Sequence, residues 1–211
     1  EVVRVAQLTG VKFEISHLKM MGETQWGRSD ELLAKIDLAR AKGIRISCDQ
    51  YPYTVSSSAL TSSLPKRAMD GGYAAMVERL KDDAYFAELS ADGFPEMYHR
   101  ASPDRIVVSC TPNAVYPEII GKSLTQIADE MKLPLLEAIR RVLIKANGNV
   151  QCHYACMDER DLLNIMSRRD ICTCSDGRGY DFAHPFGRPH PRYAGTFCRF
   201  LRLVREHSLM P

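Results

Sequence analysis

The sequence predicts an α/β fold whose strands are parallel. A short, apolar, β-prone segment at residues 11–16 is followed by an amphipathic helix at 30–42 and a second apolar strand at 44–48. The connections are short, and strand and helix patterns alternate again after residue 105. Strands that alternate with helices over short connections are typical of a parallel sheet or barrel.

The first expected element is a helix at residues 1–8, where apolar residues recur on one face until Thr9 and Gly10. Because a domain seldom begins inside a helix that has no cap, we expect that more polypeptide precedes this segment. The helix at 30–42 is expected to begin after Ser29 as its N-cap and to end at Gly43.

The middle of the chain departs from this alternation. Residues 54–63 are rich in serine and are predicted to form a loop, and residues 66–105 combine many charges with a helix at 72–80. The predicted organisation has three parts: barrel-type strand–helix–strand units at 1–53, an inserted capping segment at 54–105, and the remaining strands and helices at 106–211.

Regular elements return at residue 106. The periodicity of apolar residues predicts, in order, a strand at 106–110, helices at 124–132 and 135–146, a strand at 150–154, a helix at 159–168, a strand at 171–175 and a closing helix at 193–207. The second of these helices follows Pro134, a residue that suits a helix start.

The composition argues against some partners. The chain has 28 Lys and Arg residues against 26 Asp and Glu, a net charge of +2, so charge gives no reason to expect nucleic acid or an anionic membrane. No apolar run is long enough to span a bilayer.

Four of the seven cysteines lie close in sequence, namely Cys152, Cys156, Cys172 and Cys174. Their spacing lacks the closely paired knuckles of a structural zinc site. Cys172 and Cys174 stand in an apolar segment that is predicted to be a buried strand, where a free thiol behaves as a small hydrophobic group. We therefore expect free thiols and a reducing, cytoplasmic location.

Two candidate catalytic residues follow predicted strands. His17 ends the strand at 11–16, and Asp176 ends the strand at 171–175. In parallel α/β folds the loops after the strands converge on one cleft, where an imidazole can bind a metal or act as a base and a carboxylate can transfer a proton. A structural, hydrogen-bonded histidine and an ordinary Ser-Asp-Gly turn explain the same pattern, and the spacing leaves both interpretations open.

Other side chains could complete such a cleft. Arg192, in a proline-stiffened loop, could bind a substrate carboxylate through two nitrogens, and Tyr51 and Tyr53 follow another strand. An exposed arginine and two packed tyrosines would explain these residues equally well. Because His17, Tyr51 and Asp176 all follow strands, a parallel sheet would place them on one side.

Four motifs occur in order along the chain. They are Ile15-Ser-His-Leu-Lys19 followed by Trp26-Gly27, Asp49-Gln-Tyr-Pro-Tyr53 with its serine-rich run, Ser175-Asp-Gly177, and His190-Pro-Arg-Tyr193 with Gly195-Thr-Phe197. Together they resemble the N-acyl-D-amino-acid deacylase (D-aminoacylase) family of the amidohydrolase superfamily. The resemblance extends over almost the whole chain and corresponds to the C-terminal part of the catalytic barrel.

The resemblance implies a partial (β/α)8 TIM-type barrel with an inserted segment between late strands. It also implies zinc-dependent hydrolysis of the amide bond of N-acyl-D-amino acids, which are small-molecule substrates. By motif position, His17 would be a zinc ligand and Asp176 the catalytic acid/base. Lys19, Tyr51 and Arg192 would contact the substrate near its carboxylate.

The family's other metal ligands precede the matched segment, so the remaining zinc ligands are expected upstream and the chain alone is expected to be inactive. An incomplete barrel exposes strand edges, so the missing N-terminal barrel or self-association would be needed. His184 competes with His190 as the counterpart of the family's His-Pro residue.

Two alternative functions stay open. Another amidohydrolase, of the dihydroorotase or hydantoinase type, would share the fold, although the motifs around Tyr51 and Arg192 argue against it. A non-catalytic interaction domain could also have kept the barrel surface, because fold does not determine function.

Overall fold

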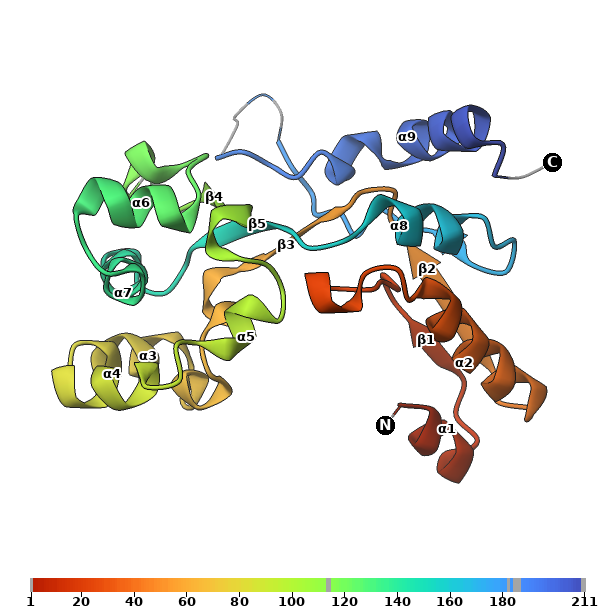
Figure 1. Cartoon of the computed structure of the whole chain (residues 1–211), viewed down its shortest axis with the longest axis horizontal. Coiled ribbons are helices and arrows are strands. Elements are labelled where there is room, and N and C mark those ends of the chain that lie inside the picture. Colours follow the sequence, from red (N-terminus) through yellow and green to blue (C-terminus); the bar gives the residue numbers. More distant parts are fainter. Residues whose placement is uncertain (1, 113–114, 182, 184–186, 210–211) are drawn as a thin grey trace. The chain divides into compact units, whose positions relative to one another are not determined.

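The computed structural model describes residues 2–112, 115–181, 183 and 187–209. These residues form two compact units (Figure 1). The first unit comprises Glu1–Thr54, Met157–Gly179 and Pro191–Pro211, and the second comprises Val55–Cys156 and Tyr180–His190.

The first unit contains a three-stranded parallel sheet. Its strands are β1 (Phe13–Ile15), β2 (Ile46–Gln50) and β6 (Cys172–Thr173), in the order β1-β2-β6. Helix α2 (Ser29–Ala41) connects β1 to β2, so the predicted strand–helix–strand unit is confirmed. The other helices of this unit are α1 (Val2–Thr9), α8 (Glu159–Met166) and α9 (Arg192–His207).

One face of α2 packs onto the sheet. Leu33, Ile36 and Ala39 recur at helical spacing and are buried with Ile46 and Cys48 of β2. This is the apolar stripe that the sequence predicted for the helix. Burial of such a stripe is the main source of stability for a helix of this length.

The N-terminus of α2 differs from the prediction. Arg28 occupies the N-cap position, and Ser29 is the first helical residue. The carboxylate of Asp161 on α8 accepts hydrogen bonds from the backbone N–H groups of Gly27, at 2.7 Å, and Ser29, at 3.0 Å. A carboxylate from another helix thus accepts hydrogen bonds at the start of α2, where unpaired N–H groups attract negative charge.

The second unit is built on an antiparallel sheet. Its strands are β3 (Val55–Ala59), β5 (Gln151–Ala155) and β4 (Ile106–Cys110), in the order β3-β5-β4. The α-helices around it are α3 (Gly72–Leu80), α4 (Asp83–Ser90), α5 (Pro95–Tyr98), α6 (Leu124–Met131) and α7 (Leu135–Lys145).

The loop prediction for residues 54–63 is wrong, because β3 lies within it. Serine has little intrinsic preference for strands, but β3 pairs with five consecutive residues of β5, and these ladder hydrogen bonds override that preference. The 3₁₀ turn Leu60–Ser63 follows directly. The assignment of residues 54–105 as an inserted segment stays a prediction.

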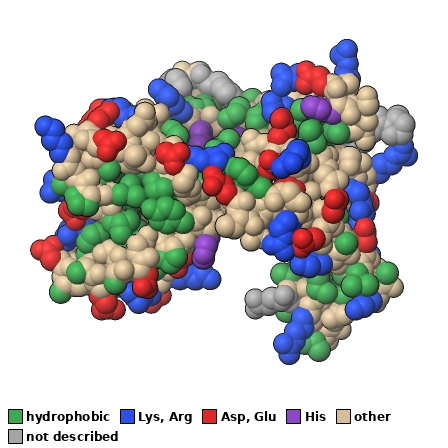
Figure 2. Space-filling view, in the orientation of Figure 1, with side chains coloured by type: hydrophobic (Ala, Val, Ile, Leu, Met, Phe, Trp, Pro, Cys, Tyr) green, Lys and Arg blue, Asp and Glu red, His purple; other side chains and the backbone are tan. Residues whose placement is uncertain are grey.

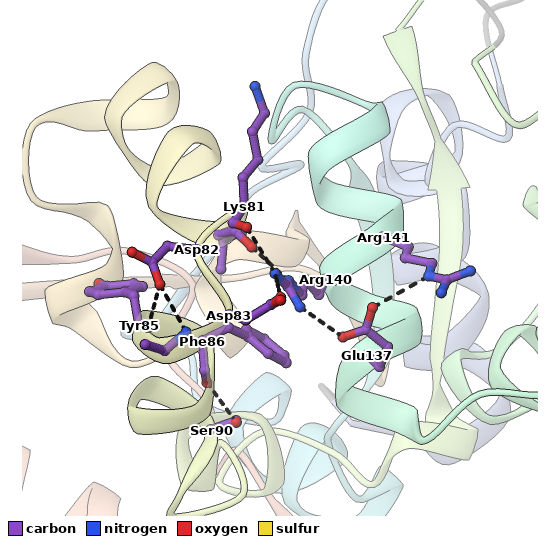
Figure 3. A network of polar contacts seen from close by, with 11 residues as sticks. Lys81, Asp82, Asp83, Tyr85, Phe86, Ser90, Glu137, Arg140 and Arg141 are labelled. Carbon is purple, nitrogen blue, oxygen red and sulfur yellow. Dashed lines mark hydrogen bonds and ion pairs between the residues drawn. The ribbon is translucent and has the colours of Figure 1, made fainter.

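A largely buried arginine joins three helices of the second unit (Figure 3). Arg140 of α7 donates hydrogen bonds to the backbone carbonyls of Leu80 and Lys81, at 2.6 and 3.2 Å, where α3 ends. It also pairs with Asp83 of α4 at 2.6 Å, and its guanidinium lies 4.8 Å from the centre of the Phe86 ring. One side chain therefore satisfies carbonyls at the α3 C-terminus and holds α4 beside α7.

All seven cysteines lie among the described residues and are free thiols. Cys152 is buried in β5, but Cys172 is exposed on β6, so the prediction that Cys172 lies in a buried strand is wrong. Acidic and basic side chains are intermixed over the face seen in Figure 2. None of the helices, as far as they are described, has the length and apolar character needed to cross a membrane.

Candidate active site

Three of the candidate residues follow the three parallel strands of the first unit. His17 comes two residues after β1, Tyr51 directly after β2, and Asp176 three residues after β6. Since the strands are parallel and adjacent, their carboxyl ends share one edge of the sheet. The sequence predicted that these residues follow parallel strands and lie on one side of the sheet, and the direction and order of the three strands confirm this.

The side chains form a continuous series of contacts along this edge. Lys19 Nζ lies 2.9 Å from His17 Nδ1 and 5.2 Å from the centre of the Tyr51 ring. The Arg192 guanidinium lies 4.7 Å from the same ring, and Arg192 Nη2 is 2.9 Å from Asp176 Oδ2. All five residues predicted for the site therefore meet in one cluster, which we call the strand-end cluster.

Burial divides this cluster into a rigid part and an accessible part. Tyr51 is fully buried, and the Arg192 side chain is only 5% exposed. The Asp176 side chain is 36% exposed, and His17 is exposed as well. The Tyr51 ring and the Arg192 guanidinium are thus buried, whereas the His17 imidazole and the Asp176 carboxylate are open to solvent.

The segment after β2 holds the start of α9 and with it Arg192. The Tyr53 hydroxyl donates to the carbonyl of Pro191 at 3.4 Å, and Arg199 Nε donates to the carbonyl of Pro52. Gly195 allows the close approach, because a Cβ there would lie 2.7 Å from the Tyr53 hydroxyl oxygen. The two predicted tyrosines therefore have different tasks: Tyr51 contacts the cluster, and Tyr53 packs against the helix.

His17 and Asp176 both adopt left-handed backbone conformations, with φ of 45° and 43°. Non-glycine residues pay a free-energy cost of about 1 kcal/mol for this region. Such conformations persist where the surrounding structure fixes them, and they concentrate at functional sites. His17 and Asp176 are two of seven described non-glycine residues with positive φ, and they are the two for which the sequence predicted metal binding and proton transfer.

One member of the arrangement, Asp49, was absent from the predicted site residues. Its carboxylate accepts a hydrogen bond from the backbone N–H of His17, and Ser16 Oγ lies 3.3 Å from both carboxylate oxygens. Burial, followed by a hydrogen bond to Asp49, raises the pKa of Cys174 to about 12. The signal was present in the sequence, because Asp49 opens the Asp-Gln-Tyr-Pro-Tyr motif at the end of a strand.

The two histidine-proline candidates lie outside the strand-end cluster. His190 is buried in the second unit, where its Nε2 lies 3.0 Å from the carbonyl oxygen of Val55 and its ring is 5.1 Å from that of His153. His184 is outside the described residues.

The described residues do not make a complete metal site. No group of three or more His, Cys, Asp or Glu side chains among them could hold a metal ion. His17 contributes one imidazole, and an ammonium donating to Nδ1 leaves the ring proton on Nε2. Coordination through either nitrogen would therefore require Lys19 to move away, and further ligands would have to come from elsewhere.

A parallel sheet with reactive side chains at its carboxyl ends is the arrangement used by α/β hydrolytic enzymes, and comparison with known proteins points to the amidohydrolases. No protein-family model matches the sequence. The chain is nevertheless 32% identical over all its 211 residues to the N-acyl-D-glutamate deacylase of Alcaligenes xylosoxydans xylosoxydans, of which it spans 34%.

Solved structures give the same result. An N-acyl-D-glutamate deacylase from Bordetella bronchiseptica, complexed with zinc and a phosphonate inhibitor, is 29% identical with a TM-score of 0.68; the match covers 99% of this chain and 34% of that one. A D-aminoacylase described as defining a novel subset of amidohydrolases is 27% identical with a TM-score of 0.65, covering 100% and 34%. The resemblance to this family is confirmed, and the chain spans about a third of the length of these relatives.

Proposed function

We propose that this chain is the later part of a zinc-dependent hydrolase that cleaves the amide bond of N-acyl-D-amino acids. The observation that carries the proposal is the strand-end cluster, in which the five residues of the family's motifs meet along one sheet edge. Relatives with this activity in their names, similar over the full length of the chain, support it.

Asp176 is the proposed acid/base residue. A hydrolase of linear amides must take a proton from the attacking water and deliver one to the leaving amine, and a solvent-accessible carboxylate can do both. Arg192 keeps the Asp176 carboxylate in place through their 2.9 Å contact. The carboxylate proposed to transfer the proton is thus held by a buried arginine.

Lys19, Tyr51 and Arg192 are the proposed substrate contacts. Lysine and arginine provide positive charge for a substrate carboxylate, and both cations lie close to the buried ring of Tyr51, at 5.2 and 4.7 Å from its centre. A substrate carboxylate that reached Arg192 would share that guanidinium with Asp176. Release of Lys19 from His17 would serve both proposed roles, because it frees the imidazole and the ammonium together.

His17 is the proposed zinc ligand within this chain. Zinc in hydrolases acts as a Lewis acid and lowers the pKa of bound water. Since a catalytic zinc needs about three protein ligands, we propose that the others come from additional polypeptide, as the greater length of the relatives suggests. The three parallel strands would then be part of a (β/α)8 barrel.

Exposed apolar side chains support the need for a covering partner. Val2, Val5 and Leu8 on α1 and Phe197 and Leu201 on α9 are all exposed. The missing barrel strands or a second copy of the chain would cover such surface. We also propose a cytoplasmic location, consistent with seven free thiols.

The experiment that tests the proposed function uses the chain extended upstream to the length of its relatives. Zinc content and hydrolysis of N-acetyl-D-amino acids are measured, with the L-enantiomers for comparison. We expect Asp176→Ala to retain zinc and to lose activity by about 100- to 10,000-fold, the usual contribution of a general acid/base. We expect His17→Ala to lose both zinc and activity.

Matched controls are Asp129→Ala and His207→Ala, which alter an exposed carboxylate on α6 and an exposed imidazole on α9. Both should keep zinc and activity at the level of the unaltered protein. Cleavage of cyclic amides without cleavage of N-acyl amino acids would favour a dihydroorotase or hydantoinase type. A zinc-free, inactive extended protein would favour a non-catalytic interaction domain.

A further inference from the structure

The carboxylate of Asp49 contacts the end of the neighbouring strand β1. On the β1 side it accepts the backbone N–H of His17 and lies 3.3 Å from the hydroxyl of Ser16. Asp49 itself belongs to β2, so its side chain connects the ends of two of the three strands that carry the strand-end cluster.

Backbone hydrogen bonds also join the ends of these strands. Leu18 N–H donates to the carbonyl of Asp49 at 2.8 Å, and Cys174 N–H donates to the carbonyl of Gln50 at 3.0 Å. The main chain of Asp49 therefore pairs with the residue after His17, while its side chain pairs with His17 itself. Between them, these two contacts fix the backbone on both sides of the imidazole.

This fixation matters because His17 is in the left-handed region, with φ of 45°. A charge-assisted hydrogen bond to the His17 N–H favours that conformation over the extended one that an L-residue prefers. The direction of the Cα–Cβ bond follows from the backbone, so the position of the imidazole follows from Asp49.

We propose that Asp49 is a positioning residue that sets the place of the His17 imidazole relative to Tyr51 and Asp176. The reaction it would serve is the proposed deacylation, so its catalytic meaning rests on that proposed function. Asp49 touches neither the substrate nor the reacting atoms; it acts through the backbone of His17. Partners that orient a ligand in this way commonly change metal affinity or activity by about 10- to 100-fold when altered.

The first test follows the histidines of the 211-residue chain by NMR after selective ¹⁵N and ¹³C labelling. In Asp49→Ala we expect the His17 amide to exchange with solvent about tenfold faster, because its charged acceptor is gone. The His17 ring signals should shift as well. Asp49→Asn keeps an oxygen acceptor without the charge and should give an intermediate result.

Two comparisons make the result specific. His99 and His207 lie in other parts of the chain and should not change in any variant. Glu14→Gln alters a β1 carboxylate that contacts Ser47 of β2 away from the strand ends, and it should leave His17 unchanged. If His17 keeps its amide protection and ring shifts in both Asp49 variants, the proposal is overturned.

The second test measures Asp49→Asn in the upstream-extended protein. We expect kcat to fall by about 10- to 100-fold while KM stays within about threefold, because substrate binding is not the altered step. Rates equal to those of Glu14→Gln would overturn the positioning role. If the unaltered extended protein hydrolyses no N-acyl-D-amino acid, the proposed function fails, but the histidine spectra still decide whether Asp49 places His17.

Discussion

Residue by residue, the first unit contains a second charged cluster that has no part in the strand-end cluster. Arg168 pairs with Asp37 of α2 at 2.7 Å and with Asp170 at 2.8 Å, and Arg40 also contacts Asp170. The hydrogen bond from Arg168 lowers the pKa of Asp170 to about 2. The same arginine lowers the pKa of Asp37.

A pH dependence of stability follows from these pKa shifts. A carboxyl group whose pKa is lower in the folded chain than the unfolded value of about 3.9 stabilises the fold above that pH. The stabilisation is lost as the pH falls towards 2. Because the Asp170 side chain is 41% exposed, solvent screening limits its contribution to roughly 1 kcal/mol or less.

The measurement is urea unfolding from pH 2 to 7, followed by fluorescence of Trp26, which is the only tryptophan and lies in the first unit. Asp170→Asn should be less stable than the unaltered chain at pH 6 and equal to it near pH 2. Glu206→Gln removes an exposed ion pair with Arg202 and should have little effect at any pH. A difference for Asp170→Asn that stayed constant down to pH 2 would contradict this account.

Among the elements, α3, α4 and α7 depend on Arg140 (Figure 3). Its side chain is 12% exposed, whereas that of Arg141, one position further, is 58% exposed and pairs only with Glu137 among the ion pairs described. Replacing Arg140 with Met leaves the Leu80 carbonyl without its donor and Asp83 without its cation. We expect a loss of about 1–3 kcal/mol in the free energy of unfolding of the second unit, chiefly from the unsatisfied carbonyl because Asp83 is exposed.

Arg141→Met is the matched control and should change stability by less than about 0.5 kcal/mol. Hydrogen exchange followed by mass spectrometry resolves the effect by element, with faster exchange expected in α3 and α4 for the Arg140 variant. Equal exchange in the two variants would show that Arg140 does not hold these helices together.

The sequence predicted the elements better than their pairing. The β4 segment and α3 lie at the expected residues, because strong apolar periodicity marks both. Strand β3 was missed because its serines carry no apolar alternation, and the antiparallel direction of β5 was missed because direction depends on partners far away in the sequence. Asp49 was missed for a similar reason, since its role is visible only when the ends of β1 and β2 are adjacent.

The shared placement of His17, Tyr51 and Asp176 after adjacent strands, by contrast, could be predicted because its signal is local. His17 and Asp176 follow apolar strands within two or three residues, and the carboxyl ends of adjacent parallel strands lie together. Exposure of Cys172 could not be predicted, because it depends on what covers an edge strand of two residues.

For the whole molecule, the described residues supply one imidazole to the strand-end cluster and no complete metal site. We therefore expect residues 1–211 alone to retain less than stoichiometric zinc after dialysis and to hydrolyse no N-acetyl-D-amino acid above background. Metal analysis and amine release, run beside the extended protein, test this. Zinc-dependent turnover by residues 1–211 alone would disprove the expectation and would imply that ligands assemble within or between copies of this chain.

The left-handed backbone at His17 and Asp176 has a consequence for engineering. Glycine would occupy both positions without steric strain, so a search guided only by heat resistance would be drawn to these two sites. Each such replacement would delete a reactive side chain while making the polypeptide more robust. A stabilised version of this chain should therefore be sought at other positions, with these two residues held constant from the outset.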